Sequence, residues 1–546
     1  MSTTVQPGGR APTPDATRQV ARGIAHGALL IAVLTVCARV AGFGRQLVFA
    51  RTVGPTCVGS TYQTANTVPN ILYEIAAGGA LASLVVPLLA AGVSAGDRAR
   101  VRHTASALLT WTVLLLAPLA LAVAIFARPV VGLLLGGTTC AGAVDLGARM
   151  LVVFAPQIVL YGVGIVLAGV LQAHERFAGP ALAPLLSSLV VIGAYLTYRL
   201  EAGFSSSIAG LGRGAELTLS IGTTLGVAVL SLSLLVPLRR TGLRLVPTLR
   251  FPPGAARRAR QLAAAGVAAL IAQQVSVAIA LRLANERTAG GTVVVYALAQ
   301  TVFLVPWAVL AVPLATAAFP RLSTAAQDGD AAGYRRTTGQ VTRAVVAVSV
   351  VAMAMLIAAA WPVARLLVEG VGRHADVGAL AQGIVAFAPG LVGYGLLALL
   401  SRALYARHDA RVPAACTVAG WLVVVVADVV LSDLLPTGDR VLALALGNTI
   451  GMTVAALLLA AGVLRRAGAG TLAGLPRTAG VALVAAAAGG TVGRLVADAL
   501  PGSGAGAAVG QSAAVMTVTL LVAGGVFAVL ARDDVRMVLR YRRAGG

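Results

Sequence analysis

Lysine is absent from this sequence, and acidic side chains are scarce. Only 11% of the 546 residues are charged, whereas soluble domains carry about 25%. The hydrophobic share of 58% and the mean hydropathy of +0.89 exclude an ordinary soluble protein. Apolar runs of about 20 residues, long enough to cross a bilayer, recur along the whole chain. The composition therefore predicts an all-α membrane protein with many spans.

The sequence motifs of common enzymes are missing as well. There is no phosphate-binding P-loop, no G-x-S-x-G nucleophile elbow and no cluster of metal ligands. The four cysteines, Cys37, Cys57, Cys140 and Cys416, lack metal-ligand spacing, and we expect Cys37 and Cys416 to be buried free thiols. These absences leave ATP hydrolysis and hydrolase chemistry without support, and they favour a transporter over an enzyme.

Fourteen apolar segments are long enough to form membrane helices. Seven lie in the first half, at 25–50, 57–94, 103–127, 142–172, 177–199, 215–238 and 258–285. Seven more lie at 291–319, 339–366, 376–405, 410–433, 441–464, 477–499 and 508–531. Val130–Leu135 is apolar but too short to span a bilayer, so we expect an interfacial piece there.

Arginine is distributed unevenly among the predicted connections. About 29 of the 42 arginines lie in the N-terminal tail, the even-numbered connections and the C-terminus. Cytoplasmic loops collect basic residues, so both termini are predicted to be cytoplasmic in a multi-pass protein of the cytoplasmic membrane. This topology explains the net charge of +23 without nucleic acid as a partner. The tail 1–22 is rich in Pro, Thr, Gly and Arg and is expected to be disordered.

Two segments of the chain repeat each other without a gap. Each matched residue lies 233 positions from its counterpart, and an even number of spans separates the copies. The pattern predicts two six-helix lobes in a parallel pseudo-twofold repeat, followed by two C-terminal helices. The matched residues are Phe154, Ala155, Pro156, Tyr161, Gly162, Ala173, Pro180 and Ala181 with Phe387, Ala388, Pro389, Tyr394, Gly395, Ala406, Pro413 and Ala414.

The repeat also sets the predicted boundaries of the chain. A first lobe of six spans is expected at 23–238 and a second lobe of six spans at 258–466. A cytoplasmic linker rich in arginine joins them at 239–257, and the last two spans occupy 467–531. A cytoplasmic tail at 532–546 ends the chain.

The first two predicted spans carry charge where lipid excludes it. Arg39, Arg45 and Glu74 fall inside them, and such residues usually face a water-filled cavity or a partner. Moved by 233 positions, the two arginines fall on the apolar Ala272 and Ala278. The second lobe therefore folds without charge at these positions, which favours a functional role for the arginines. An ion pair with Glu74 is the alternative.

Motif residues in the first, second and eighth spans resemble those of a known family. They are Arg39-Val40-Ala41-Gly42-Phe43-Gly44-Arg45, Ala50-Arg51, Gly54, Ala65-Asn66-Thr67-Val68-Pro69-Asn70, Gly79-Ala80, Val86-Pro87, Pro306, Pro313-Leu314 and Phe319-Pro320-Arg321-Leu322-Ser323. With this pattern the chain resembles the MurJ/MviN family of lipid II flippases in the MOP exporter superfamily, and in particular its actinobacterial branch. The span count and the two-lobe plan agree with that family.

The resemblance implies a transporter that moves lipid II, the undecaprenyl-pyrophosphate-linked peptidoglycan precursor, across the cytoplasmic membrane by alternating access. It implies that Arg39 and Arg45 bind the pyrophosphate, because arginine offers a planar, permanently charged fork to phosphate oxygens. The last two spans would form a groove for the lipid tail, and cell-wall synthesis proteins are possible partners. The further substrate-binding candidates are Glu74, Asn66, Asn70 and Gln274. For the glutamine, an interhelical hydrogen bond is an equal alternative.

Four positions depart from the family pattern. Well-studied members carry an acid near Ser60, an arginine near Tyr73, an acid near Gly78 and an arginine near Thr301, and these four residues are uncharged here. The cavity is therefore poorer in cations than the family pattern implies. The identity of the cargo follows from the resemblance and not from these positions.

Asp428 is a candidate ligand for a coupling cation. Some family members bind sodium between the seventh, eleventh and twelfth spans, which implies a site at Asp428 with Asn448 or Thr449. The alternative is a helix-capping role beside Asp433, and the apolar Ala280 at the matching seventh-span position argues against sodium. No other cofactor is expected. The membrane potential is a second source of driving force, because one charge crossing 100 mV is worth about 2.3 kcal/mol.

Two other functions fit the same sequence. One is an exporter of another polyprenyl-linked glycan or of a small drug-like cation, although a cation exporter needs acids in its cavity. The other is a non-transporting scaffold for cell-envelope assembly. Replacing Arg39 or Arg45 by alanine separates these readings, because a scaffold would still work and a flippase would not.

Overall fold

Helices make up all the regular secondary structure that the computed structural model describes, over residues 14–76, 89, 93, 95–203, 207–243, 245–250, 255–288, 290–368, 376–500 and 504–531. The side chains of 14–32, 255–266 and 505 lie outside this description. Twelve of these helices are long and apolar enough to cross a membrane, and a pair bent by 41° makes a thirteenth span. The predicted second span, 57–94, is described only in part. The chain is thus a multi-pass helical protein, and the predicted number of fourteen spans is approximate.

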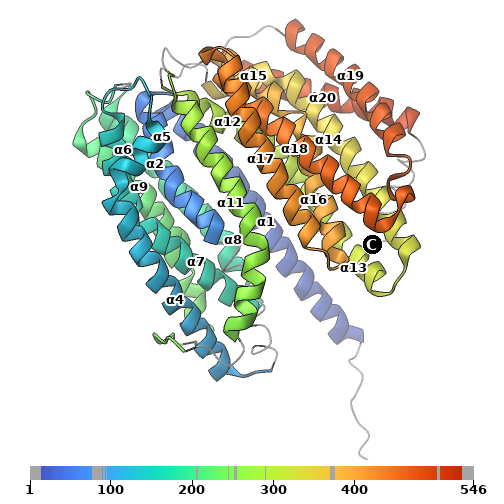
Figure 1. Cartoon of the computed structure of the whole chain (residues 1–546), viewed down its shortest axis with the longest axis horizontal. Coiled ribbons are helices and arrows are strands. Elements are labelled where there is room, and N and C mark those ends of the chain that lie inside the picture. Colours follow the sequence, from blue (N-terminus) through green and yellow to red (C-terminus); the bar gives the residue numbers. More distant parts are fainter. Residues whose placement is uncertain are drawn as a thin grey trace, which may run out of the picture.

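The described part of the first lobe contains nine helical segments, whose arrangement can be followed in Figure 1. Proline marks one of its breaks, because Pro156 begins a helix directly after the preceding one ends. The predicted interfacial piece is a short helix of its own, α5. The segments are α1 (Pro14–Thr52), α2 (Cys57–Ile75), α4 (Arg98–Ile125), α5 (Ala127–Leu135), α6 (Ala143–Phe154), α7 (Pro156–Ala173), α8 (Ala178–Ala202), α9 (Arg213–Leu232) and α10 (Leu235–Arg239).

The second lobe and the last two spans are also built from helices. A π-helical turn, Trp307–Ala311, follows Pro306, which lacks the N–H that would continue the α-helical pattern. The segments of the second lobe are α11 (Ala255–Asn285), α12 (Thr292–Pro306), α13 (Val312–Gln327), α14 (Ala331–Val368), α15 (Val377–Phe387), α16 (Gly390–Ala406), α17 (Arg411–Leu434) and α18 (Arg440–Ala467). The last two spans are α19 (Leu475–Ala499) and α20 (Ala505–Leu530).

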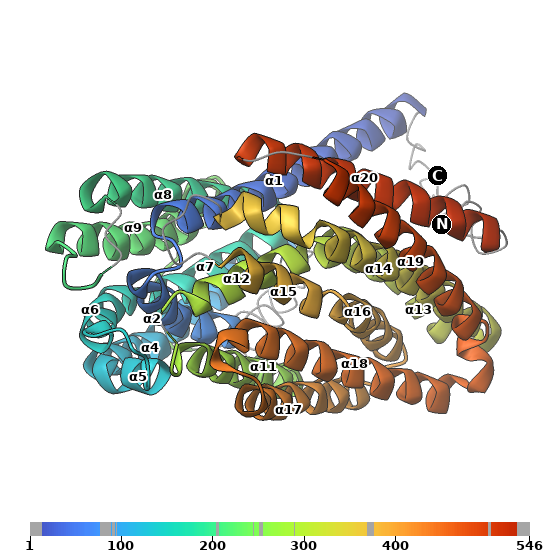
Figure 2. The same ribbon diagram turned by 90° about the horizontal axis from the view of Figure 1, so that it is seen from above.

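Helix ends confirm the parallel repeat. The helices α6 and α15 end at Phe154 and Phe387, which lie 233 positions apart, and the same offset relates the ends of α1 and α11 and the ends of α7 and α16. Glu175 and His408, at equivalent positions, both have φ near +59°. Figure 1 shows the two lobes side by side, and Figure 2 shows α19 and α20 packed beside α14. The last two helices therefore extend the second lobe.

The linker between the lobes lies along α4. The backbone N–H of Val246 donates to Ser106 Oγ (3.0 Å), and that of Thr248 donates to Thr110 Oγ1 (3.1 Å). Trp111 Nε1 donates to Leu249 O at 3.0 Å. Side chains of α4 thus form hydrogen bonds with backbone groups of this extended segment, which lies outside any helix or sheet.

Three sequence-based expectations require correction. The tail was expected to be disordered up to Arg22, whereas α1 already begins at Pro14, because proline is well tolerated in a first helical turn. Cys37 is exposed on the surface of α1, so it is not a buried thiol, and Cys416 is only half-buried. Pairing of the other two cysteines was not predicted, and Cys57 and Cys140 form a disulfide because the fold brings the start of α2 to the loop that follows α5.

Candidate functional site

One face of α2 carries the polar groups of the first-lobe site. Asn66, Asn70 and Glu74 follow each other at four-residue spacing, and Tyr73 lies beside them, so all four lie on one side of the helix. Asn70 Nδ2 donates to the backbone O of Asn66 at 2.7 Å. The side-chain Oδ1 of Asn66 is buried without a hydrogen-bond partner. An orphaned acceptor of this kind is available to a ligand donor.

Tyr161 of α7 holds this face in place. Its hydroxyl donates to Asn70 Oδ1 at 2.9 Å, and its ring lies 4.4 Å from the ring of Tyr73, tilted by 35°. Tyr161 also lies within electrostatic reach of Arg45 and Glu74. Predicted site residues of α1 and α2 thus lie near Tyr161, which comes from a different helix, α7.

The two arginines of α1 occupy different environments. Arg45 is half-buried and lies within electrostatic reach of Tyr62, Tyr161 and Tyr195, whereas Arg39 is exposed. Glu74 is exposed as well. Among the described residues, neither arginine forms an ion pair with Glu74, so the alternative of a structural pair is not realised. Of the two arginines, Arg45 is therefore the one that lies near these tyrosines.

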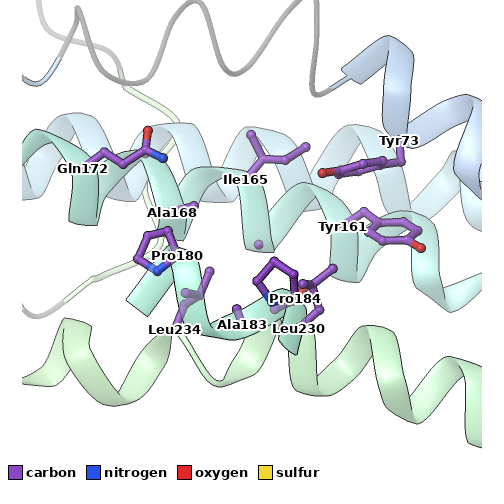
Figure 3. Close-up of a pocket in the computed structure, with 13 residues that line it drawn as sticks. Tyr73, Tyr161, Ile165, Ala168, Gln172, Pro180, Ala183, Pro184, Leu230 and Leu234 are labelled. Atoms are coloured by element: carbon purple, nitrogen blue, oxygen red, sulfur yellow. The ribbon is translucent and has the colours of Figure 1, made fainter. Parts of the chain in front are cut away.

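A cavity of about 250 Å³ opens beside the tyrosine pair (Figure 3). Figure 3 shows Tyr73 and Tyr161 at one end of the cavity and Gln172 at the other. Between them the walls are mostly apolar, with Pro180 and Pro184 from α8. Such a space, lined by apolar groups with a few polar ones, is typical of a small-ligand subsite. The cavity can therefore receive a ligand group of low polarity, and Tyr161 at its end lies within electrostatic reach of Arg45.

The remaining predicted residues lie elsewhere. Gln274 is buried in α11, and no described hydrogen bond links it to the tyrosine cluster. Ser60 is buried and accepts a hydrogen bond from the backbone N–H of Gly291 at 2.7 Å. Thr301 Oγ1 donates to Ala297 O within its own helix at 2.7 Å. Gly78 falls outside the described residues. Two of the positions that lack the family's charge therefore make local or lobe-to-lobe hydrogen bonds.

A second candidate site lies between α17 and α18. Asp428 is only 1% exposed, and neither carboxylate oxygen has a hydrogen-bond partner. Asn448 Oδ1 is likewise unpartnered, while Thr449 Oγ1 donates to Ala386 O at 2.7 Å. A Cβ at Gly447 would collide with the carboxylate, so glycine is what lets Asp428 reach α18. A buried carboxylate without a partner has to take up a cation or a proton.

These groups include donor atoms of the kind that a hard cation binds. Two carboxylate oxygens and one amide oxygen are hard oxygen donors, and all three are buried and unsatisfied. Ala280, at the matching position of α11, is buried and apolar and adds no ligand. Groups of three or more His, Cys, Asp or Glu side chains do not occur in the described part of the chain. The donor set is thus small and suits one weakly held ion.

The two lobes are bonded to each other at one end of the bundle. Five hydrogen bonds of 2.7–3.3 Å, which we name the gate contacts, join the first-lobe segments α2, α5 and 136–142 to the turn between α11 and α12. They run from Arg287 N to Gly137 O, from Thr139 Oγ1 to Thr288 O, from Gly291 N to Ser60 Oγ, and from Asn285 Nδ2 to Thr64 Oγ1 and to Leu134 O. Arg51 Nη2 adds a bond to Leu366 O at 2.8 Å, from α1 to α14. This end of the molecule is closed.

Sequence reasoning missed Tyr161 as a site residue and missed the disulfide. Tyr161 was identified only as a member of the repeat, although a tyrosine inside a membrane helix needs a partner for its hydroxyl. The predicted topology placed Cys57 and Cys140 on the same side of the membrane, at the start of the second span and before the fourth. That shared side was the available signal for pairing.

Comparison with known proteins identifies the relatives of the chain. Residues 49–502 match the family model described as "Lipid II flippase MurJ". The lipid II flippase of Burkholderia cenocepacia is 27% identical over 447 residues, which cover 80% of this chain and 83% of that protein. The probable lipid II flippase of Vibrio cholerae is 22% identical over 406 residues, covering 72% and 75%. The matched range begins after Arg39 and Arg45, so the role of these residues rests on the site itself.

Solved structures show the same fold. A lipid II flippase in an inward closed conformation superposes with a TM-score of 0.74 at 17% identity, covering 93% of this chain and all of that one. An inward-facing multidrug transporter of the MATE family, in the MOP superfamily, gives a TM-score of 0.64 at 14% identity and covers 81% of this chain and 98% of that one. These likenesses establish the fold of the chain.

Proposed function

Because the chain belongs to the lipid II flippase MurJ family, we propose that it moves lipid II from the inner to the outer face of the cytoplasmic membrane by alternating access. The observation that carries the proposal is the half-buried Arg45, which has no acidic partner among the described residues and lies within electrostatic reach of Tyr161. A charge inside the bilayer is costly, so a cation placed there without an ion pair indicates an anionic ligand.

Arg45 supplies the charge that recognises the pyrophosphate. Its guanidinium offers paired N–H donors to phosphate oxygens, and charge-assisted hydrogen bonds of this kind are about twice as strong as neutral ones. Arg39, exposed about 1.7 turns earlier on the same helix, meets the cargo before it reaches Arg45. Asn66 Oδ1 accepts from a hydroxyl or amide N–H of the head group, because it has no donor of its own.

The site also explains how this chain works with fewer cations than the family pattern. Tyr73, at the position of a family arginine, stacks with Tyr161 and forms one end of the 250 Å³ cavity. Tyrosine rings pack against the apolar faces of sugar rings and donate hydrogen bonds at their hydroxyl groups. Recognition therefore depends on one strong charge and an aromatic wall.

The closed end of the bundle faces the outside in this proposal. The arginine-rich connections lie at the other end, which is the cytoplasmic one by the positive-inside rule. The Cys57–Cys140 disulfide lies at the closed end, and disulfides persist on the oxidising side of a membrane. Both observations support cytoplasmic termini. Cargo then enters from the cytoplasmic side, and release requires the gate contacts to break.

Asp428 and Asn448 hold the coupling cation in the second lobe. When bound, a sodium ion or a proton supplies the positive charge that the buried carboxylate lacks. The three unsatisfied oxygens of Asp428 and Asn448 favour the ion, and the membrane potential adds to the driving force. Coupling of this kind joins an anion-binding first lobe to a cation-binding second lobe.

The proposal is tested by supplying this chain to a bacterium whose own lipid II flippase is depleted. We expect growth to be restored and lipid II to become accessible to a reagent added outside the cell. Arg45→Ala, produced at the same level in the membrane, should leave lipid II inside. If the intact chain is present in the membrane and lipid II still stays inside, the lipid II assignment is wrong, and another polyprenyl-linked glycan becomes the cargo to test.

A further inference from the structure

The Cys57–Cys140 disulfide lies among the gate contacts. Cys57 is the first residue of α2, which also holds the gate residue Ser60. Cys140 lies in the loop 136–142, which holds the gate residues Gly137 and Thr139. The disulfide thus links two first-lobe segments that each bind the second lobe at the gate.

The second lobe packs directly against the sulfur atoms. A Cβ at Gly290 would lie 2.8 Å from Cys140 Sγ and 2.9 Å from Cys57 Sγ, closer than real side chains approach. Gly290 also has a φ of +85°, a conformation that favours glycine. At the closed gate, Gly290 of the second lobe therefore packs against the disulfide of the first lobe.

Besides the disulfide, the loop that carries Cys140 is held by short-range hydrogen bonds, such as the one from Cys140 N to Thr138 Oγ1 at 3.3 Å, and by its gate contacts. Gly137 and Gly142 both adopt positive φ values, +87° and +78°, which glycine reaches without steric cost but also leaves easily. A cross-link between residues 83 positions apart removes many of the conformations open to this loop. A loop held in its binding conformation loses less entropy when it docks, so the docked state gains population.

We propose that the Cys57–Cys140 disulfide braces the outer gate, so that closure of the outer side depends on the oxidised state of these two cysteines. With the disulfide, α2 and the loop 136–142 engage and release the second lobe as one unit. Without it, the loop docks poorly and the outward-facing state becomes more populated. Cys57 and Cys140 are positioning residues in this account, and the account rests on the proposed alternating access and orientation.

Single-molecule energy transfer across the outer end tests the proposal. Maleimide dyes are attached at Arg213→Cys, at the start of α9, and at Thr437→Cys, in the turn between α17 and α18, since both positions are exposed. Cys37 and Cys416 are replaced by serine in the full-length background. We expect the outward-facing population to rise about three- to tenfold, relative to the inward-facing one, when Cys57 and Cys140 are both changed to alanine.

Reduction of the folded, labelled protein with a phosphine provides a second route that does not depend on folding of the variant. Loss of the disulfide is verified by the mass of alkylated thiols. A merely structural disulfide would lower the folded fraction and leave the ratio of states unchanged among folded molecules. An unchanged ratio after verified loss of the disulfide, by either route, overturns the proposal.

The readout needs no cargo, so its outcome is separate from that of the proposed function. If the ratio of states shifts but the chain does not expose lipid II in depleted cells, the disulfide brace stands and the cargo assignment fails. If lipid II is exposed and the ratio does not shift, the assignment stands and the brace fails.

Discussion

The two lobes place the same helices around different chemistry. Tyr161 and Tyr394 occupy equivalent positions, 233 residues apart. In the first lobe the hydroxyl of Tyr161 donates to Asn70, whereas in the second lobe the ring of Tyr394 lies 5.4 Å from the ring of Phe303, edge to face. Phe303 is the counterpart of Asn70. One repeated tyrosine therefore joins a polar cluster in the first lobe, whereas in the second lobe its ring packs on Phe303 and its hydroxyl accepts from Asn448 Nδ2 at 3.5 Å.

At its own candidate site, the second lobe carries a charged residue where the first lobe carries a tyrosine. Asp428 is equivalent to Tyr195 of the first lobe. Tyr195 is satisfied there by a hydrogen bond to Tyr62 at 2.9 Å, whereas Asp428 is buried without a partner. In the proposed function the shared backbone supplies the frame, and each lobe uses its unpaired charge for a different ligand: an anion in the first and a cation in the second.

The largest effect is expected at Arg45, where the first lobe departs most from the second. Arg45→Gln removes the charge and should lower lipid II transport about 10- to 100-fold, which is the size of one lost charged hydrogen bond of about 1.5–3 kcal/mol. The matched control is Arg128→Gln, because the Arg128 side chain is 73% exposed and pairs only with Asp145 on the surface. Transport by the control should stay within about twofold. Equal effects of the two changes would remove Arg45 from the site.

A change at Asp428 should act on the cation response and leave anion recognition intact. Sodium should raise the Tm of the wild-type protein, because a ligand that binds only the folded state stabilises it. Asp428→Asn should abolish this rise and lower transport about tenfold, the effect of one lost charged contact. The control is Asp145→Asn, at a carboxylate that is 55% exposed. A sodium-dependent Tm that survives in Asp428→Asn would place the cation elsewhere.

The membrane helices, the repeat and the charge of the first-lobe site could be predicted from the sequence, because apolar runs and repeated residues are local signals. The partners of Tyr161 could not, since Asn70 lies 91 positions away and their contact depends on how α2 packs against α7. The same holds for Cys57 and Cys140, separated by 83 positions. A sequence reveals which charges are misplaced in lipid, whereas packing decides which groups surround them.

The repeat-related tyrosines Tyr161 and Tyr394 give a comparison with a smaller expected effect. Tyr161→Phe deletes the hydroxyl that donates to Asn70, and we expect lipid II affinity to fall about two- to tenfold, corresponding to about 0.5–1.5 kcal/mol for one hydrogen bond. Tyr394→Phe is its repeat-related control and should leave lipid II affinity unchanged. Binding of labelled lipid II to the purified proteins measures both. A loss of affinity of similar size in the control would mean that binding of lipid II is not confined to the first lobe.

The smallest effect is expected at Glu74, which lies near the first-lobe site without an arginine partner among the described residues. Glu74→Gln removes a negative charge that repels a pyrophosphate, so affinity for undecaprenyl pyrophosphate should rise by about two- to fivefold at low salt, as exposed charge pairs contribute about 0.2–1 kcal/mol. Glu201→Gln, an exposed glutamate at the end of α8, is the control. A fall in affinity would instead indicate that Glu74 contacts the cargo.

The central claim is that Arg45 and the first-lobe cluster carry lipid II across the bilayer. The most direct measurement uses the purified chain in phospholipid vesicles that contain fluorescent lipid II, with a membrane-impermeant quencher added outside. The intact protein should make the protected inner half of the lipid II accessible to the quencher, and Arg45→Gln should leave that half protected. Equal quenching with the two proteins, or protection retained with both, would contradict the account.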